Sequence, residues 1–287
     1  QEFQNMPKQI SEITVAYWST KGLGAPLRQM VLYAGVPLKC IFYKTTTVKT
    51  HDGLSFSGSH WTDAKPALQE LNPLINLPYI EVDEEDQKIV FTQSIACMTV
   101  IGRKLGMLGS NVVENGQCEQ LLCEIMDVRN KMVEFAYTYH ENQKQVAGEL
   151  FDATMVASKG SFKKLESWLE SKRASSTNRY LVGSEATAAD FALFEMLDQY
   201  AEMIHFFELI PCQNKKPEEI LESCDKSNLA NLYEHFKNSP KMERYFQSLL
   251  SDLPFNNKSA SFGSGKGGER WNAEIDLDST PDLIQFD

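Results

Sequence analysis

The sequence has no long apolar run. No stretch approaches the roughly 18–20 apolar residues that a membrane-spanning helix requires, so we expect no membrane span. The segment from Gln1 to Glu12 also lacks the apolar centre of a secretory signal. The chain begins with Gln1 rather than Met, which leaves open whether a targeting segment precedes it. On these grounds we predict a cytoplasmic protein.

Cysteine and histidine are sparse, and their spacing is not that of metal ligands. The chain has six cysteines and five histidines. It contains no CxxC pair, and no histidine-rich stretch lies near a cysteine, so we expect no metal. The cysteines are better interpreted as free thiols of a reducing compartment. They are Cys40, Cys97, Cys118, Cys123, Cys212 and Cys224.

Basic residues are too few for a nucleic-acid surface. The chain has 28 Lys and Arg against 39 Asp and Glu, a net charge of -11, and it shows no basic patch of the kind that nucleic acid requires. Residues 269–287 alone hold six acidic residues and one basic residue, a net charge of −5. The remainder is only mildly acidic and indicates no class of partner.

The 287 residues, 42% of them hydrophobic, are enough for one or two domains with a sizeable core. Residues 13–108 alternate strand and helix patterns, whereas from Glu114 onward the apolar residues recur at helical intervals. We predict an α/β domain over residues 12–108 and an all-α domain over residues 114–254. Residues 255–287 are Gly/Ser-rich and then acidic, which predicts a flexible tail.

The first strand–helix unit brings a tyrosine to the rim of the predicted sheet. Residues 13–17 are β-branched and aromatic, as in a short strand. Gly22 and Gly24 allow a sharp turn, and Pro26 suits the first turn of the helix that follows. Tyr17 should therefore lie where open α/β sheets bind ligands. The simpler interpretation is an ordinary strand–helix unit with a tyrosine at its rim.

The residues after the first helix predict the other elements of the α/β domain. Residues 38–43 read as a second strand, and the polar residues 44–59 as a loop. "LPYIEV" and "KIVF" flank the acidic turn 83–87 and predict an antiparallel hairpin. "TQSIACMTVIGRKLG", residues 92–106, predicts a helix that ends at Gly106.

Pro78 and Ser94 could each have a purely structural role, as a turn proline and a helix cap. A cis Leu77–Pro78 bond, however, would turn the Leu77 backbone outward as an edge for an extended peptide. Ser94 begins a helix, where backbone N–H groups favour an anion such as a carboxylate. Together with Tyr17, these residues predict a peptide-like, carboxylate-bearing ligand.

Thr187 and Asp190 have the spacing of a capping box, with Asp in place of the usual Glu or Gln. They precede the apolar run of "ATAADFALFEMLD". We assign them to folding rather than to chemistry.

In this combination the chain resembles the cytosolic glutathione transferases, nearest the mu class with some sigma-like features, over residues 13–250. "AYWSTKGLGAPLRQMVLYAG" resembles the strand–turn–helix that carries the catalytic residue. "NLPYIEVDEEDQKIVFTQSIA" resembles the glutathione-binding hairpin, and "ATAADFALFEMLD" the capping-box helix. The resemblance implies a thioredoxin-like N-terminal domain, an all-helical C-terminal domain and usually a homodimer. It implies a detoxification enzyme with glutathione as co-substrate and no metal.

The resemblance also implies a role for individual residues. Tyr17 would activate the glutathione thiol, and Asp127 would reach the glutamyl amine bound to the neighbouring subunit. The other glutathione contacts would be Trp18, Trp61, Lys65, Asn76, Leu77, Pro78, Gln93 and Ser94. The electrophile pocket would be lined by Thr20, Leu23, Met126, Val133 and Tyr137.

Four features depart from the mu pattern. Ser57 stands where mu members carry an arginine that helps to bind glutathione. Leu74 or Ile75 replaces the aromatic key of the mu dimer, which leaves the strength of the dimer open. The insertion at 212–225 and the tail at 255–287 have no counterpart in the resemblance.

Three functions are compatible with these residues. The first is a transferase that conjugates glutathione to a hydrophobic electrophile through a tyrosine-stabilised thiolate. The second is a non-catalytic structural or binding subunit with the same fold, in which the 255–287 tail would contact a protein partner. The third is a sigma-type glutathione-dependent isomerase. The sequence leaves the electrophile itself open.

Overall fold

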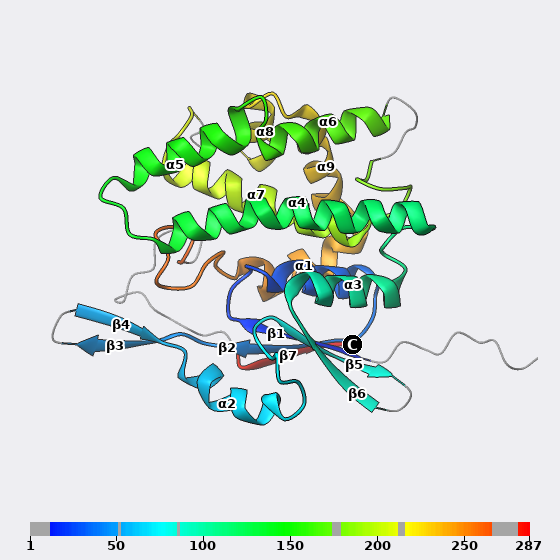
Figure 1. Ribbon diagram of the computed structural model, residues 1–287, viewed down its shortest axis with the longest axis vertical. Coiled ribbons are helices and arrows are strands. Elements are labelled where there is room, and N and C mark those ends of the chain that lie inside the picture. Colours follow the sequence, from blue (N-terminus) through cyan, green and yellow to red (C-terminus); the bar gives the residue numbers. More distant parts are fainter. Residues whose placement is uncertain (1–11, 51–52, 85–86, 174–178, 212–215, 266–280) are drawn as a thin grey trace, which may run out of the picture.

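The chain first builds a sheet flanked by helices and then stacks a layer of helices against it (Figure 1). The computed structural model describes residues 12–50, 53–84, 87–173, 179–211, 216–265 and 281–287. The elements of the first part are β1 (Ile13–Trp18), α1 (Gly24–Tyr33), β2 (Leu38–Tyr43), β3 (Thr46–Thr50), β4 (Gly53–Ser57), α2 (Ser59–Gln69), β5 (Tyr79–Glu84), β6 (Gln87–Thr92) and α3 (Ser94–Leu105).

The second part is helical. Its α-helices are α4 (Val112–Tyr137), α5 (Gln143–Phe151), α6 (Ser161–Arg173), α7 (Ala188–Phe206), α8 (Pro217–Ser223), α9 (Ser227–Lys237) and α10 (Glu243–Phe246). A π-helical turn spans Asp152–Val156, and 3₁₀ turns span Pro240–Met242 and Leu249–Asp252. A final strand, β7 (Leu283–Phe286), follows. The predicted α/β domain followed by an all-α domain is therefore confirmed.

The main sheet has the strand order β6-β5-β1-β2-β7. β1 and β2 are parallel because α1 crosses over between them, and the other neighbours are antiparallel. Figure 1 shows α1 and α3 between the sheet and the helical layer, with α2 on the opposite side of the sheet. A large core joins α1 and α3 to the helices, and a smaller core beneath α2 contains Tyr43, Trp61 and Tyr79.

The predicted loop at residues 44–59 is wrong in part. Residues 46–50 and 53–57 form a two-stranded antiparallel sheet of their own, β3–β4. The stretch "TTVKT" is rich in β-branched residues, which favour an extended strand. The polar composition of the segment concealed this preference.

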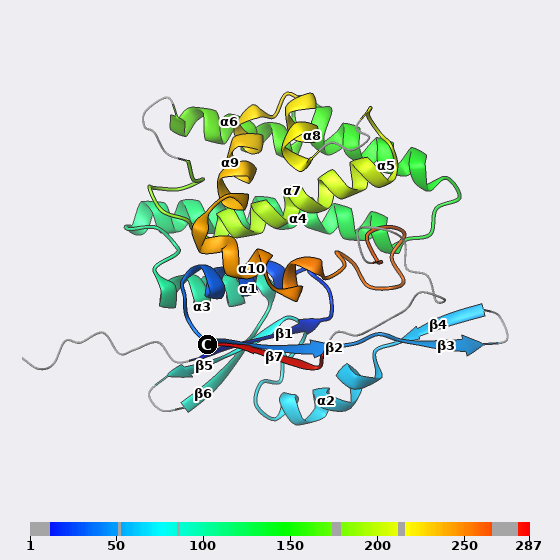
Figure 2. The ribbon, with the colours of Figure 1, turned by 180° about the vertical axis from the view of Figure 1, so that it is seen from behind.

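The prediction of a flexible tail over residues 255–287 is also corrected. Leu283–Phe286 forms β7, which pairs antiparallel with β2 at the edge of the main sheet (Figure 2). Ile284 and Phe286 pack against the large core, and the carbonyl of Asp287 accepts a 2.6 Å hydrogen bond from Arg244. β7 covers backbone groups that an exposed edge would leave unpaired. Residues 266–280 of the tail lie outside the described residues.

Other local predictions are confirmed. β5 and β6 form the expected hairpin, and α3 ends at Gly106, whose φ of 71° is the left-handed cap of a helix. Asp190, fully buried, accepts hydrogen bonds from the N–H of Thr187 at 2.8 Å and from its hydroxyl at 2.7 Å. In the 212–225 insertion, α8 buries Ile220 and Leu221, while residues 212–215 lie outside the described part.

Candidate active site

Tyr17 lies near the end of β1, with 7% of its surface exposed. The turn that follows packs on its ring: a Cβ added to Gly22 would lie 3.0 Å from the Tyr17 hydroxyl oxygen, and one on Gly24 would lie 2.9 Å from the Tyr17 Cβ. Gly22 also has a φ of 37°, which side chains disfavour. The turn therefore encloses the Tyr17 side chain closely, and only glycine fits at these two positions.

A buried arginine holds this turn in place. Arg28 of α1 is 0% exposed and donates from Nη1 to the Thr20 carbonyl at 2.9 Å and from Nη2 to the Trp18 carbonyl at 3.3 Å. Its guanidinium also lies 4.7 Å from the centre of the Phe42 ring. Hydrogen bonds from a charged donor are stronger than neutral ones. Arg28 therefore holds the carbonyls of Trp18 and Thr20, on either side of Ser19, in the turn that follows Tyr17.

A cavity of about 380 Å³ opens beside this turn. It is lined by residues from the loop before β5, the start of α3 and the middle of α4. They are Leu23, Asn76, Leu77, Pro78, Gln93, Ser94, Ile95, Met126, Arg129 and Asn130. The Leu77–Pro78 peptide bond is cis, so of the two roles open to Pro78 the structure has the one that turns the Leu77 backbone outward.

The wall opposite α4 is stabilised by Thr92. Its hydroxyl accepts from the N–H of Asn76 at 3.1 Å and lies 2.8 Å from the Asn76 carbonyl, to which it donates. Gln93 follows with φ 70°, an unfavourable conformation for a residue with a side chain. Such conformations persist where the surrounding structure enforces them, often at ligand sites.

The start of α3 gives the cavity a place for an anion. α3 begins at Ser94, and the preceding Gln93 side chain makes no capping hydrogen bond. The first N–H groups of a helix have no partner within the helix, and the helix dipole favours negative charge there. Arg129 lies on the opposite wall of the cavity and adds a positive charge. The cavity therefore combines an extended backbone edge with two groups that attract carboxylates.

Not all predicted glutathione contacts line this cavity. Asn76, Leu77, Pro78, Gln93 and Ser94 do. Trp18, Lys65 and Trp61 do not, and neither does Tyr17, which lies behind the turn that contributes Leu23. Trp61 is buried against Tyr43, with ring centres 5.1 Å apart, which makes it largely a core residue. The ammonium of Lys65 lies 5.8 Å from the Trp61 ring centre, and Trp18 packs on Gly58.

Asp127 is exposed on a different face of α4. It lines a groove of about 260 Å³ between α4 and α6, together with Gln120, Leu121, Cys123, Glu124, Lys164, Leu165 and Trp168. Asp127 therefore does not line the 380 Å³ cavity of its own chain, although Met126 and Arg129, close to it on α4, do.

The residues predicted to line the electrophile pocket do not all lie at one cavity. Leu23 and Met126 line the cavity, whereas Thr20 is buried and Val133 is half-buried. Tyr137 is 41% exposed, and its hydroxyl accepts a 2.8 Å hydrogen bond from the N–H of Asn257, in the segment after α10. The same segment reaches the turn after β1, where the Lys21 N–H donates to the Pro254 carbonyl at 2.8 Å.

Three lining residues were absent from the sequence prediction: Ile95, Arg129 and Asn130. Ile95 follows Ser94 directly. Arg129 and Asn130 lie three and four positions after Met126 on α4, so they share a helix face with it. That spacing could have identified them once Met126 was assigned to the site.

Two buried thiols of the chain, Cys97 and Cys40, are poorly suited to nucleophilic chemistry. Burial raises the pKa of Cys97 to about 12 and that of Cys40 to about 11, which keeps both thiols protonated. Among the described residues, no three His, Cys, Asp or Glu side chains are grouped as metal ligands. In the same part of the chain, no helix is both long and apolar enough to cross a membrane.

The thioredoxin-like sheet, the cis-proline edge and the stacked helical layer together define a glutathione transferase fold. Residues 126–249 match the family model described as "Glutathione S-transferase, C-terminal domain". The solved glutathione S-transferase Blo t 8 superposes with a TM-score of 0.64 at 20% identity, covering 87% of this chain and 99% of that one. NaGST-2 superposes with a TM-score of 0.59 at 20% identity, covering 83% and 96%.

Curated proteins with similar sequences are also glutathione S-transferases. The chain is 28% identical to glutathione S-transferase 2 of Gallus gallus over 65% of this chain and 74% of the relative. It is 24% identical to glutathione S-transferase Mu 3 of Homo sapiens and 25% identical to the class-mu 26 kDa isozyme 51 of Fasciola hepatica; each alignment covers 88% of this chain and 96% of the relative. These findings confirm the predicted resemblance to glutathione transferases of the mu type and support a glutathione transferase enzyme.

Proposed function

We propose that this chain conjugates glutathione to hydrophobic electrophiles, and that the Tyr17 hydroxyl stabilises the glutathione thiolate. The observation that carries the proposal is the cavity beside the turn that follows Tyr17, which Leu23 of that turn lines and in which a backbone edge at Leu77 lies with a helix N-terminus at Ser94. Glutathione is an extended tripeptide with two carboxylates, and the cavity offers hydrogen-bonding backbone and positive potential to such a molecule.

The two ends of the ligand have separate partners in this proposal. Gln93 and Ser94 would bind the γ-glutamyl group at the start of α3, and Asn76 and Leu77 would pair with the cysteinyl backbone. The thiol would then lie toward Tyr17, whose hydroxyl approaches Gly22 in the turn beside the cavity. Trp18, Trp61 and Lys65 would hold the glycyl end from the α2 side. Arg129 adds charge at the cavity in a chain that has Ser57 in place of the loop arginine.

Binding is tested by retention of the purified chain on an immobilised glutathione matrix. We expect the wild type to be retained and the double variant Gln93→Ala, Ser94→Ala to lose retention, because it removes side-chain contacts at the carboxylate end. Ile89→Ala, a half-exposed position on β6 outside the cavity, serves as the matched control and should be retained. Unchanged retention of the double variant would remove the carboxylate site from the proposal.

Catalysis is tested by an assay of the same chain with glutathione and a generic aryl halide. Turnover that requires both substrates is the expected result. Glutathione retention without any conjugation or isomerisation would overturn the proposed activity and favour a binding subunit with the same fold.

We also propose that the active form is a homodimer. Leu74, 75% exposed in the loop after α2, occupies the position of the aromatic key in the mu resemblance. The α4–α6 groove offers an apolar floor of Leu121, Leu165 and Trp168 that could receive it. Asp127 lies in the same groove, so a partner seated there would bring Asp127 toward the other subunit's glutathione.

Light scattering measures this assembly. We expect a dimer for the wild type and a shift toward monomer for Leu74→Glu, because a carboxylate would replace an apolar contact and would lie in a groove that already holds Glu124 and Asp127 against Lys164 alone. Val156→Glu alters another exposed apolar residue, 59% exposed and outside the groove, and should leave the mass unchanged. A wild-type monomer with full activity would contradict both the dimer and the role of Asp127.

A further inference from the structure

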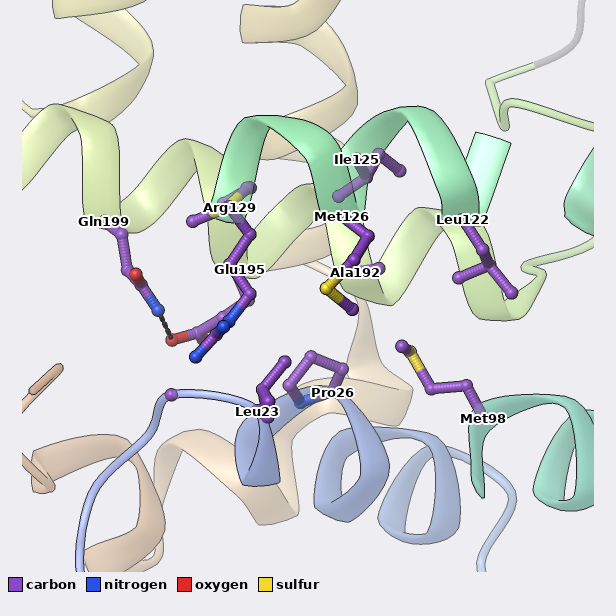
Figure 3. A pocket seen from close by; sticks show the side chains of 12 residues that line it. Leu23, Pro26, Met98, Leu122, Ile125, Met126, Arg129, Ala192, Glu195 and Gln199 are labelled. Atoms are coloured by element: carbon purple, nitrogen blue, oxygen red, sulfur yellow. Dashed lines mark hydrogen bonds between the residues drawn. The ribbon is translucent and has the colours of Figure 1, made fainter. Parts of the chain in front are cut away.

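A second, smaller cavity lies deeper than the glutathione cavity, where the two parts of the chain meet. We call it the interdomain slot. It is formed by the turn after β1 and α1 (Gly22, Leu23, Pro26), by α3 (Met98), by α4 (Leu122, Ile125, Met126, Arg129) and by α7 (Ala192, Glu195, Met196, Gln199). Figure 3 shows Glu195 and Gln199 toward one end and Met98 and Leu122 toward the other.

The interdomain slot adjoins the larger cavity, because three residues line both. Leu23, Met126 and Arg129 line both the slot and the larger cavity. Gly22 also lines the slot, and it is the residue whose added Cβ would lie 3.0 Å from the Tyr17 hydroxyl oxygen. A thiol held by Tyr17 would therefore lie near the entrance of the slot.

The slot is mostly apolar and narrow. Its free volume of about 20 Å³ is room for about one water molecule. Met98, Met126 and Met196 supply three of its walls, and methionine side chains are unbranched and adapt readily to a ligand. A ligand larger than a water molecule would therefore require these side chains to change rotamer.

The far end of the slot carries a buried acid with an unused hydrogen-bonding atom. Glu195 is 3% exposed, and its Oε1 accepts a 3.1 Å hydrogen bond from Nε2 of Gln199. Its Oε2 has no hydrogen-bond partner within the described residues. Burial raises the pKa of Glu195 to about 8, despite the opposing influence of Lys21 and Arg28, so the carboxyl is mainly protonated at neutral pH. Because Oε1 already accepts from Gln199, the proton belongs on Oε2.

We propose that the interdomain slot receives the apolar body of an uncharged ligand with one acceptor oxygen, such as a ketone, ester or nitro oxygen, and that Glu195 Oε2 donates a hydrogen bond to it. That this ligand is the electrophile rests on the proposed transferase function. Buried polar atoms in native proteins nearly always have a partner, and this acceptor would supply the missing one. The slot is lined by apolar side chains apart from Arg129, Glu195 and Gln199, which favours a ligand with a largely apolar body.

The test compares acetophenone with ethylbenzene, which share shape and differ in one acceptor oxygen. Affinities of the full-length chain for both are measured by ligand-observed NMR. Glu195→Leu should lower the ratio of the two affinities by about three- to tenfold, the usual value of one neutral hydrogen bond. Glu195→Gln should keep the wild-type ratio, because its amide can accept from Gln199 and still donate into the slot.

Two further variants locate the effect and protect the test against misfolding. Glu202→Leu changes a carboxyl on α7 outside the slot and should keep the wild-type ratio. Ala192→Met fills the slot and should weaken both ligands at least tenfold. An equal ratio in wild type and Glu195→Leu, or undiminished binding to Ala192→Met, would overturn the proposal.

Glutathione retention, measured in parallel, separates the two proposals. Retention without the ratio change would reject only the slot. The ratio change without retention would support the slot as a ligand site and reject the transferase function.

Discussion

Tyr17→Phe should lower the turnover of glutathione conjugation near pH 7 by about ten- to a hundredfold. A free thiol with a pKa of about 8.5 is mostly protonated at that pH, and the thiolate is the nucleophile. A hydrogen bond to a charged acceptor is worth about 1.5–3 kcal/mol. At about 1.4 kcal/mol for each pKa unit, the phenol would lower the pKa of bound glutathione by one to two units. Tyr17→Phe lacks this hydrogen bond, so the pKa of bound glutathione should not be lowered in the variant.

The measurement is the pH dependence of turnover together with thiolate absorbance of bound glutathione. In the variant both profiles should move to higher pH, while glutathione affinity stays near the wild-type value, because only one oxygen is removed. Loss of the thiolate acts on the chemical step more than on binding. The ring should remain packed on Gly22 and Gly24, which contact carbon atoms of Tyr17 as well.

The control is Ser19→Ala, which removes a half-exposed hydroxyl from the same turn. It should leave the pH profile unchanged. Normal turnover in Tyr17→Phe, combined with an inactive Ser19→Ala, would assign the thiolate to the other hydroxyl.

Asp190→Ala should lower the free energy of unfolding by about 3–5 kcal/mol, an effect in the range reported for broken buried networks. The carboxylate of Asp190 is fully buried and accepts from the N–H of Leu181 at 2.7 Å as well as from the N–H and hydroxyl of Thr187. Alanine leaves two buried backbone N–H groups without acceptors, each at a cost of about 1–3 kcal/mol. It also leaves a gap at the start of α7 in the large core.

Urea unfolding, followed by circular dichroism, measures this loss. Thr187→Ala is the matched variant: it removes one hydroxyl from the same capping box and should cost about 1 kcal/mol. Equal losses for the two variants would show that the hydrogen bond to Leu181 contributes little, and a loss below about 1 kcal/mol for Asp190→Ala would contradict the network.

Much of the candidate site could be predicted because its signals are local. The turn after Tyr17, the Leu77–Pro78 bond and the helix start at Ser94 each depend on residues within a few positions of one another. Such turn and capping preferences act on the chain before any distant contact forms. Their arrangement around one cavity was inferred from the order of strands and helices.

The parts that sequence reasoning missed depend on distant segments. β7 is only four residues long, and its partner β2 lies more than 200 positions earlier, so no pattern nearby announced the pairing. For Trp61 the sequence predicted a glutathione contact but gave no sign that Tyr43 and Tyr79 enclose its ring in the smaller core. Tyr137 was assigned to the electrophile pocket, yet Asn257 from the predicted flexible tail binds its hydroxyl.

The sequence by itself determined the two-part architecture, the turn that presents Tyr17 and the capping box of α7, since periodicity and turn chemistry act over short distances. Only the tertiary structure decided which side chains share an environment. Glu195 reads in the sequence as one more residue of an apolar helix; packing α7 against α1 and α4 buries it beside Gln199 and makes it a protonated acid at neutral pH. Whether a carboxyl is buried depends on how the helices pack. The free-energy cost of removing its charge from water, which raises its pKa, therefore depends on the tertiary structure.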